Sequence, residues 1–367
     1  MGTVRRGGWT RKVLQSAAGL LLLVTALPFI PSNEWWIRLW DFPRAQIAVA
    51  LLVVAAAFVL AGLARTRVGA ATIALLIAGL AYQVARIWPY SPFHPEEVAH
   101  APNCPANARL RLLEANVLQH NRDAGPLLRL VARERPDVLL LTETDEWWAR
   151  QLRPLYAAFP HHVSVPLPNT YGMMLFSRLP LPGAEVRTLL EPDVPSIRTG
   201  LLLRNGDLVD FHAVHPRPPV PGQDTAARDA ELAVVGRQVR AARRPAIVAG
   251  DMNDVAWSDS ARLFREVSGL RDPRVGRALL PTYPAAYPGF RWPLDYVFVS
   301  PGFTLNLQRR LGRIGSDHLP MLVDLCAANL PRRAGPKPRL DADEREQVRE
   351  VIREGVQEVR EDLRRAE

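Results

Sequence analysis

Hydrophobic residues form three long runs within the first ninety positions of this chain, at residues 13–30, 47–63 and 68–87. Each run holds roughly 17–20 residues, and a helix that crosses about 30 Å of hydrocarbon needs about 20. The pattern therefore predicts a membrane anchor at residues 1–88 with three transmembrane helices. Two alternatives are a cleavable signal peptide in place of the first helix and three buried helices of a soluble domain.

Basic residues flank these runs unevenly. Four of them precede the first run and two lie between the second and third runs: Arg5, Arg6, Arg11, Lys12, Arg65 and Arg67. Lys and Arg favour the cytoplasmic ends of membrane helices, so both segments are expected in the cytoplasm. Three spans then place the chain after Trp88 outside the cytoplasm.

The apolar runs become shorter after the third one. A proline-rich linker at residues 89–108 precedes a domain at residues 109–328. In that domain, short apolar runs predict strands and apolar residues at 3.6-residue spacing predict helices. The expected helices lie at 124–134, 225–243 and 260–267, and the expected strands at 109–118, 137–142, 172–176, 200–203, 208–214, 246–249, 294–299 and 319–325. This order favours an α+β sandwich of sheets flanked by helices.

The last segment, residues 329–367, is a highly charged tail that begins with a Pro- and Arg-rich linker. Apolar residues recur in the tail at helical spacing, and they are Val348, Ile352, Val356, Val359 and Leu363. This spacing among acid–base pairs predicts a solvated or weakly self-associating helix. We assign no chemistry to it.

Polar residues stand at the ends of several predicted strands. They are Asn116, Glu143, His215, Asp251 with Asn253, Asp295, and Asp317 with His318. Carboxylate and amide oxygens are hard ligands that suit Mg²⁺ or Mn²⁺, and a histidine beside a carboxylate suits proton transfer near neutral pH. The combination favours hydrolysis of a phosphate ester, in which negative charge must be neutralised and a water activated.

In order and spacing, these segments resemble the endonuclease/exonuclease/phosphatase superfamily. Between about Arg109 and Leu325 the chain carries an early Asn, Pro-Asp-x-x-x-Leu-x-Glu, His-Pro, Gly-Asp-x-Asn, Leu-Asp-Tyr and Ser-Asp-His-x-Pro. Each motif is weak alone, but the six in this order are specific. The resemblance implies a four-layer α/β/β/α sandwich of two mainly antiparallel sheets. Membrane spans ahead of such a domain are similar to a bacterial subgroup, which implies the inner membrane and an extracytoplasmic domain.

The resemblance also implies roles for the acidic and amide residues. Glu143 would be the main ligand of Mg²⁺ or Mn²⁺, helped by Asn116 and Asp317. Asp251 would orient or deprotonate the attacking water, and Asn253 would hold the phosphate or that aspartate.

The histidines receive their roles in the same way. His318, paired with Asp317, would contact the scissile phosphate, and His215 would act as general acid at the leaving oxygen. Asp295 would orient a neighbouring histidine or loop. His212 is a rival of His215, because residues three apart face opposite sides of a strand; the proline that follows favours His215.

Three further positions bear on the same site. Tyr171 and Arg178 are candidate phosphate-binding residues by the same resemblance, although Arg178 could be a loop cation. Some family members carry an acidic residue two positions after the early Asn, where this chain has Leu118. A metal arrangement that relies on that acid is therefore not expected here.

Charge and cysteine positions add two expectations. The net charge of +9 and the pI near 10.2 favour an anionic partner, such as nucleic acid or anionic lipid. Cys104 lies before the first strand of the domain and Cys326 at the end of its last strand. Oxidising compartments permit disulfides, so a bridge between them is expected, with two unpaired thiols as the alternative.

Together these observations predict a membrane-anchored, divalent-metal-dependent phosphodiesterase that acts on nucleic acid or on a phospholipid or sphingolipid headgroup. Small phosphate monoesters are a third substrate class. Aromatic residues that could form either a lipid-facing rim or part of the core are Trp147, Trp148, Tyr283, Tyr287, Phe290 and Trp292.

Two other classes of function compete with hydrolysis. A non-catalytic membrane-anchored binding or assembly protein on a degenerate phosphatase fold would lack catalytic positions, which are all present here. A transporter or sensor would need polar or ionisable residues within its spans, and the three apolar runs contain almost none.

The predicted orientation can be tested with a reporter that fluoresces only in the cytoplasm. Fused after Leu330, the reporter should stay dark, because three spans place that residue outside the cytoplasm. The same reporter fused after Arg65 should be bright. A bright fusion at Leu330 would reverse the topology.

Overall fold

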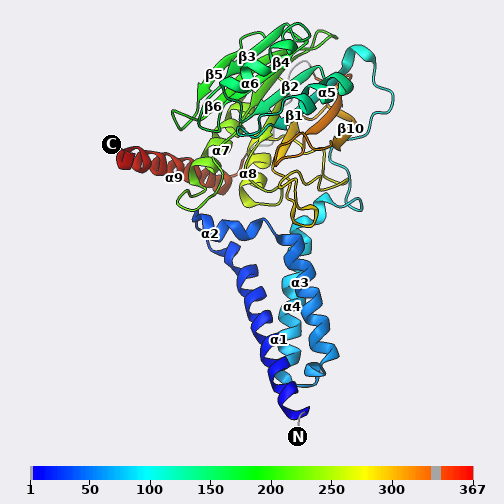
Figure 1. Cartoon of the computed structure of the whole chain (residues 1–367), viewed down its shortest axis with the longest axis vertical. Coiled ribbons are helices and arrows are strands. Elements are labelled where there is room, and N and C mark those ends of the chain that lie inside the picture. The colour runs from blue at the N-terminus through cyan, green and yellow to red at the C-terminus, as the bar shows by residue number, and fades with distance from the viewer. Residues whose placement is uncertain (1–2, 332–339, 367) are drawn as a thin grey trace. The chain divides into compact units, whose positions relative to one another are not determined.

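The computed structural model describes residues 3–331 and 340–366 (Figure 1). The chain divides into two compact units. The first is formed by Met1–Ser91 with Pro219–Asp224, and the second by Pro92–Pro218 with Thr225–Glu367.

Helices make up the amino-terminal unit. They are α1 (Thr3–Ala26), α2 (Trp35–Arg38), α3 (Arg44–Leu60) and α4 (Arg67–Ile87). Two helices, Gly8–Phe29 and Arg67–Tyr90, are long and apolar enough to cross a membrane. The segments Trp35–Asp41 and Arg44–Leu60 are bent by 71° and make a third span if they count as one. The structure therefore holds two candidate spans, or three if the bent pair is counted as one, and the sequence predicts three.

A buried polar cluster joins the helices of this unit. Arg44, which is 1% exposed, pairs with Asp41 and donates a hydrogen bond of 3.0 Å to Oε1 of Gln83. Gln83 in turn lies 3.4 Å from Oγ1 of Thr25 on α1. A buried charge is tolerated only when it is paired and hydrogen-bonded, so these contacts allow the guanidinium to sit between apolar helices.

The second unit contains two sheets. In the first, the strand order is β10-β11-β1-β2-β4-β3, and in the second it is β5-β6-β7-β8-β9. The pairs β1–β2 and β7–β8 are parallel, and all other neighbours are antiparallel. The strands are β1 (Arg109–Asn116), β2 (Val138–Thr142), β3 (His161–Val165), β4 (Met173–Ser177), β5 (Glu185–Thr188), β6 (Pro195–Leu202), β7 (Leu208–Ala213), β8 (Ala246–Asp251), β9 (Asp295–Val299), β10 (Thr304–Arg310) and β11 (Met321–Cys326).

Apolar side chains of both sheets fill the space between them, including Leu112 and Leu140 from the first sheet and Phe211 and Ile247 from the second. Helices cover the outer faces. They are α5 (Gly125–Glu134) and α6 (Glu146–Gln151) on the first sheet, and α7 (Ala226–Ala241) and α8 (Asp259–Ser268) on the second. The predicted four-layer α+β sandwich is confirmed.

Three strands of the sandwich were not predicted from the sequence, and all three are edge strands. β3 and β10 form the two edges of the first sheet, and β5 forms one edge of the second. Their burial alternates or is low. An edge strand shows an unbroken apolar run only if both its faces are buried, so these segments lack the pattern that marks the central strands.

The charged tail forms α9 (Ala342–Ala366), which packs on α7 and α8. Val348 of α9 is buried against Leu263 and Val267 of α8. The predicted helix is present, but it is not free in solvent, because Val348 and Val359 of its apolar face are buried, whereas Leu363 stays exposed.

Cys104 and Cys326 form a disulfide, with their Cα atoms 5.6 Å apart. The bond joins the segment ahead of β1 to the last residue of β11.

Candidate active site

Strand direction brings the polar residues of the two sheets to one edge of the sandwich. In the parallel pair β1–β2, Asn116 lies opposite Thr142, so Asn116 and Glu143 meet at the carboxyl ends of these strands. In the parallel pair β7–β8, the residues that follow the carboxyl ends are His215 and those after Asp251. Two antiparallel strands complete the edge, because Asp295 at the start of β9 lies opposite Asp251, and His318 just precedes β11.

Gly250 allows β8 to approach the residues after β7. Its φ of 141° lies in a region that side chains rarely adopt, and a Cβ at this position would stand 1.9 Å from the carbonyl oxygen of Val214. No residue larger than glycine fits this contact. The close approach places His215 beside Asp251, with Nε2 of the histidine 3.9 Å from Oδ2 of the aspartate.

Asn116 links the two sheets through its side-chain amide. Its Nδ2 donates to Oε1 of Glu143 at 2.7 Å and to Oδ2 of Asp251 at 3.1 Å. Its Oδ1 accepts a hydrogen bond of 2.9 Å from the backbone N–H of Leu118. The second carboxylate oxygen of Glu143 accepts from the backbone N–H of Gln119 at 3.1 Å. These bonds fix the amide orientation and both carboxylates.

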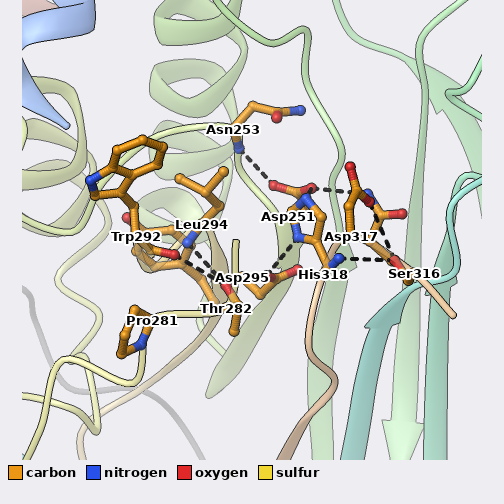
Figure 2. Close-up of polar contacts among 12 residues, drawn as sticks. Asp251, Asn253, Pro281, Thr282, Trp292, Leu294, Asp295, Ser316, Asp317 and His318 are labelled. Carbon is orange, nitrogen blue, oxygen red and sulfur yellow. Dashed lines mark hydrogen bonds and ion pairs between the residues drawn. The ribbon is translucent and has the colours of Figure 1, made fainter. Parts of the chain in front are cut away.

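His318 lies between two buried carboxylates (Figure 2). Its Nδ1 is 2.9 Å from Oδ2 of Asp295, and its Nε2 is 3.4 Å from Oδ2 of Asp251. Burial opposes the charged imidazole, but Asp295 and Asp251 outweigh it and raise the pKa of His318 to about 10. His318 is therefore an imidazolium at neutral pH.

The two aspartates differ in their ionisation. Burial raises the pKa of Asp251, although His318 partly offsets this. The positive charge of His318 and the hydrogen bond from its ring lower the pKa of Asp295 despite burial. Asp295 is thus the fixed counter-charge of the imidazolium, and Asp251 is the more basic carboxylate.

His215 has the opposite character to His318. It is 3% exposed, and burial lowers its pKa, an effect that Asp251 only partly opposes. The imidazole is therefore neutral near pH 7. The ring of Tyr171 lies 5.7 Å from the ring of His215, which places this candidate phosphate contact at the site.

Acidic groups at this edge outnumber the cations, and this suits a divalent metal. Burial raises the pKa of Glu143, and the charge of Asp317 raises it further. Carboxylate oxygens of Glu143 and Asp317 therefore provide hard donors with excess negative charge. The expected third ligand, Asn116, instead turns its amide N–H groups toward Glu143 and Asp251, and its Oδ1 accepts from Leu118. Asp251, Asp295 and His318 also place one potential ligand atom each within 4.8 Å of one another. In that second group, however, the imidazolium holds the proton that a ligating nitrogen would have to lose.

Backbone strain gathers around these residues. Three non-glycine residues at the site adopt positive φ: Leu118 at 58°, Glu143 at 60° and Asn253 at 52°. Non-glycine residues with positive φ are strained, so they persist only where surrounding contacts hold the backbone in place. They cluster at functional sites. Leu118, which replaces the family acid, contributes its backbone N–H and no carboxylate.

Two expectations from the sequence differ from the structure. Arg178 is not at the site: its Nε donates to the carbonyl of Pro136 and its guanidinium lies over the Phe159 ring. β4 is antiparallel to β2, so the residue after β4 lies at the opposite edge from Glu143. The expected pairing of His318 with Asp317 is also wrong, because the imidazole pairs with Asp295 instead.

Two residues that the sequence analysis did not place at the site also lie there. Glu114 is completely buried, and burial together with Asp295 and Asp251 raises its pKa well above the ordinary range. Tyr283 packs its ring 4.8 Å from that of His318. Glu114 could have been noticed as an acid inside an apolar strand, whereas nothing in the sequence distinguishes Tyr283 from other aromatics.

The comparison with known families identifies the class of protein. Residues 113–318, more than half of the chain, match the sequence model of the endonuclease/exonuclease/phosphatase family. The chain belongs to this family, whose members are hydrolases that act on phosphate esters.

Solved structures with a similar fold include the human Nocturnin catalytic domain with bound sulfate anion, at 19% identity and a TM-score of 0.47 over 60% of this chain and 94% of that one. An endonuclease/exonuclease/phosphatase from Beutenbergia cavernae DSM 12333 has 22% identity and a TM-score of 0.47, over 65% of this chain and 76% of the other. D. rerio TDP2 humanized by 14 mutations has 15% identity and a TM-score of 0.47, over 59% and 99%. No curated protein matches the chain significantly. Family membership therefore rests on the sequence match.

Replacing Asp295 by Asn should lower the pKa of His318 from about 10 towards its ordinary value of 6.5, because the negative charge at Nδ1 is lost. A raised pKa means that the stabilisation by this pair is fully present below pH 6.5 and is lost as the pH rises through about 10. The measurement is an NMR titration of the histidine rings in the full-length protein. Asp210→Asn, which alters a buried acid paired with Arg244, is the control and should leave His318 unchanged. A wild-type His318 that titrates near 6.5 would refute the imidazolium.

Proposed function

We propose that this protein is a membrane-anchored hydrolase of phosphate esters that uses Mg²⁺ or Mn²⁺, and that it acts as a phosphodiesterase. The observation that carries the proposal is the position of Asp251. Its carboxylate lies 3.4 Å from His318 and 3.9 Å from His215, and Asn116 bridges it to Glu143. The proposed base Asp251, the cation His318 and the proposed metal-binding carboxylate of Glu143 therefore lie around one space.

Asp251 is the group that takes a proton from the attacking water. Its raised pKa makes it a better base than an exposed aspartate. The water oxygen forms a bond to phosphorus while the ester P–O bond breaks, and the water proton passes to Asp251. Asn253 fixes the base, because its backbone N–H donates to Oδ1 of Asp251 at 3.0 Å.

His318 supplies positive charge and a proton to the ester. The negative charge of Asp251 helps to keep the proton on the His318 imidazolium. When Asp251 takes a proton from the water, that charge is lost and the imidazolium releases its proton more easily. The imidazolium can then give its proton to the leaving oxygen. His215, which is neutral because of its lowered pKa, donates a hydrogen bond to the phosphate with Tyr171 and is a poorer general acid than the sequence predicts.

A divalent cation held by the carboxylates of Glu143 and Asp317 would neutralise charge on the phosphate. Asn116 would join them as a ligand if its amide turned its oxygen toward the metal. The raised pKa of Glu143 supports this assignment, because burial and the charge of Asp317 both disfavour the ionised carboxylate, and a cation would offset them.

Two substrate classes fit the surroundings of this site. The net charge of +9 favours nucleic acid. Tyr287 and Phe290, which are 65% and 60% exposed, lie on the segment that carries Tyr283 and favour a lipid headgroup. Trp148 is fully buried and belongs to the core. The proposed location is a bacterial inner membrane with the domain outside the cytoplasm, as the basic residues around the spans favour.

The proposal is tested with the full chain in detergent micelles, supplied with Mg²⁺ or Mn²⁺. Plasmid DNA, phospholipid vesicles, sphingomyelin vesicles and a chromogenic phosphodiester are offered in parallel. Asp251→Asn should lower kcat/KM by about 10²–10⁴-fold on whichever substrate is cleaved, because it removes the base. Asp123→Asn, an exposed acid that caps a turn, is the matched control and should keep full activity.

Three outcomes distinguish a nuclease, a lipid-headgroup hydrolase and a non-catalytic binding protein. Cleavage of DNA alone identifies a nuclease, and cleavage of lipid alone identifies a headgroup hydrolase. Equal rates for the wild type and Asp251→Asn on every substrate would reject catalysis at this site and favour the non-catalytic binding protein.

A further inference from the structure

The carboxyl-terminal helix α9 contacts the segment that carries His215. Arg217 stands two residues after His215, and its Nη1 donates to Oδ2 of Asp362 on α9 at 3.0 Å. The same guanidinium forms an ion pair with Glu191, which is 4% exposed. Arg217 is therefore held on one side by the sandwich and on the other by α9.

A second contact joins α9 to the amino terminus of α7. The backbone N–H of Ala227, in the first turn of α7, donates to Oε2 of Glu358 at 2.8 Å. Thr225, which precedes the helix, makes no side-chain capping hydrogen bond to it. The first N–H groups of a helix need acceptors from outside it, and they favour negative charge. Glu358 thus takes the part of a helix cap from another segment of the chain.

The capped end of α7 leads directly to the catalytic residues. Arg228, next to Ala227 and buried, donates from Nη1 to the carbonyl oxygen of Asn253 at 2.9 Å. Nδ2 of Asn253 donates to the carbonyl of Pro216 at 2.9 Å, and its backbone N–H holds Asp251. Asn253 therefore connects the base to the residue that follows His215, and Arg228 holds Asn253 in place.

The packing between α9 and α7 is close and specific. A Cβ at Gly355 would lie 2.3 Å from Cβ of Ala230 and 2.5 Å from the carbonyl oxygen of Ala226. Backbone at this distance cannot yield to a larger side chain. Glycine at this position lets α9 lie against the first turns of α7, where Glu358 reaches Ala227.

We infer that α9 is a positioning element of the active site, which uses Asp362 and Glu358 to hold the His215–Arg217 segment and the Arg228–Asn253 contact in the arrangement that hydrolysis needs. This inference rests on the proposed function. Arg217 and Glu358 touch neither the substrate nor the reacting atoms in this scheme, so they are positioning residues. The charged tail is thereby a part of the catalytic domain.

The charges around Arg217 support its role as the link. Burial raises the pKa of Glu191 to about 7; Arg217 opposes this rise, whereas Asp193, Glu358 and Asp362 add to it. Glu191, Glu358 and Asp362 would repel one another without the guanidinium between them. Loss of Arg217 should therefore loosen α9 as well as the His215 segment.

Hydrogen exchange of the full chain tests the positioning without any substrate. Gly355→Leu should force α9 away from α7, and Asp362→Asn removes only the charge that holds Arg217. Both variants should speed exchange about tenfold or more in peptides that cover residues 214–218 and 226–230, since local opening governs exchange. Peptides from β4 should be unchanged. Glu350→Gln, on the exposed side of α9 beside Arg353, is the matched control.

Kinetics on the substrate found for the wild type test the consequence for catalysis. Asp362→Asn and Arg217→Ala should each lower kcat about tenfold with KM changed less than twofold, and the double variant should be no slower than Arg217→Ala, because both act through one contact. Arg217→Lys should recover part of the loss.

The inference fails if α9 exchanges freely in Gly355→Leu while residues 214–218 stay protected, or if Asp362→Asn keeps the wild-type kcat and the wild-type exchange of residues 214–218. An inactive wild type would reject the proposed function and with it the catalytic part of the inference. The exchange result would then still decide whether α9 positions these segments.

Discussion

The site depends on one hydrogen-bonded amide, that of Asn116, which spans the gap between the two sheets. Its Nδ2 contacts Glu143 from the first sheet and Asp251 from the second. A buried amide with two carboxylate acceptors is a strong, directional link. The close approach at Gly250 then brings His215 to the same carboxylate. The sandwich is thus the means by which acids from distant parts of the chain share one space.

Charge balance explains how so many acids can coexist there. Asp251 and Asp295 contact the His318 imidazolium, whose pKa is raised to about 10 by these carboxylates, and the charge of Asp317 adds to the rise. Burial raises the pKa of Glu114 well above the ordinary range, which disfavours a further negative charge there. The remaining excess of negative charge is what a divalent cation and an electrophilic phosphate centre require. Stability and function conflict at this edge, since each acid costs desolvation that hydrogen bonds and the charge of His318 offset.

The central strands and their terminal polar residues could be predicted from the sequence, because buried strands are continuous apolar runs and catalytic motifs follow them in a known order. The edge strands β3, β5 and β10 could not, since their exposed faces break that pattern. Partners were predicted only in part. Asp295 was expected to orient a histidine or a loop; the antiparallel register of β8 and β9 sets it opposite Asp251, and it pairs with His318. Arg178, by contrast, leaves the site through the direction of β4. The docking of α9 depends on Gly355 meeting α7 across more than a hundred residues, which local periodicity does not encode.

A double-mutant cycle between the sheets tests most directly whether they build one active site. Glu143→Gln changes the first sheet, Asp251→Asn changes the second, and kcat is measured for each single variant and for the double. If Asn116 couples both acids in one reaction, the double variant should be no more than about threefold slower than the slower single variant, since residues that act as a unit lose activity non-additively. If the two losses multiply, Glu143 and Asp251 act independently and the account of a single shared site is contradicted.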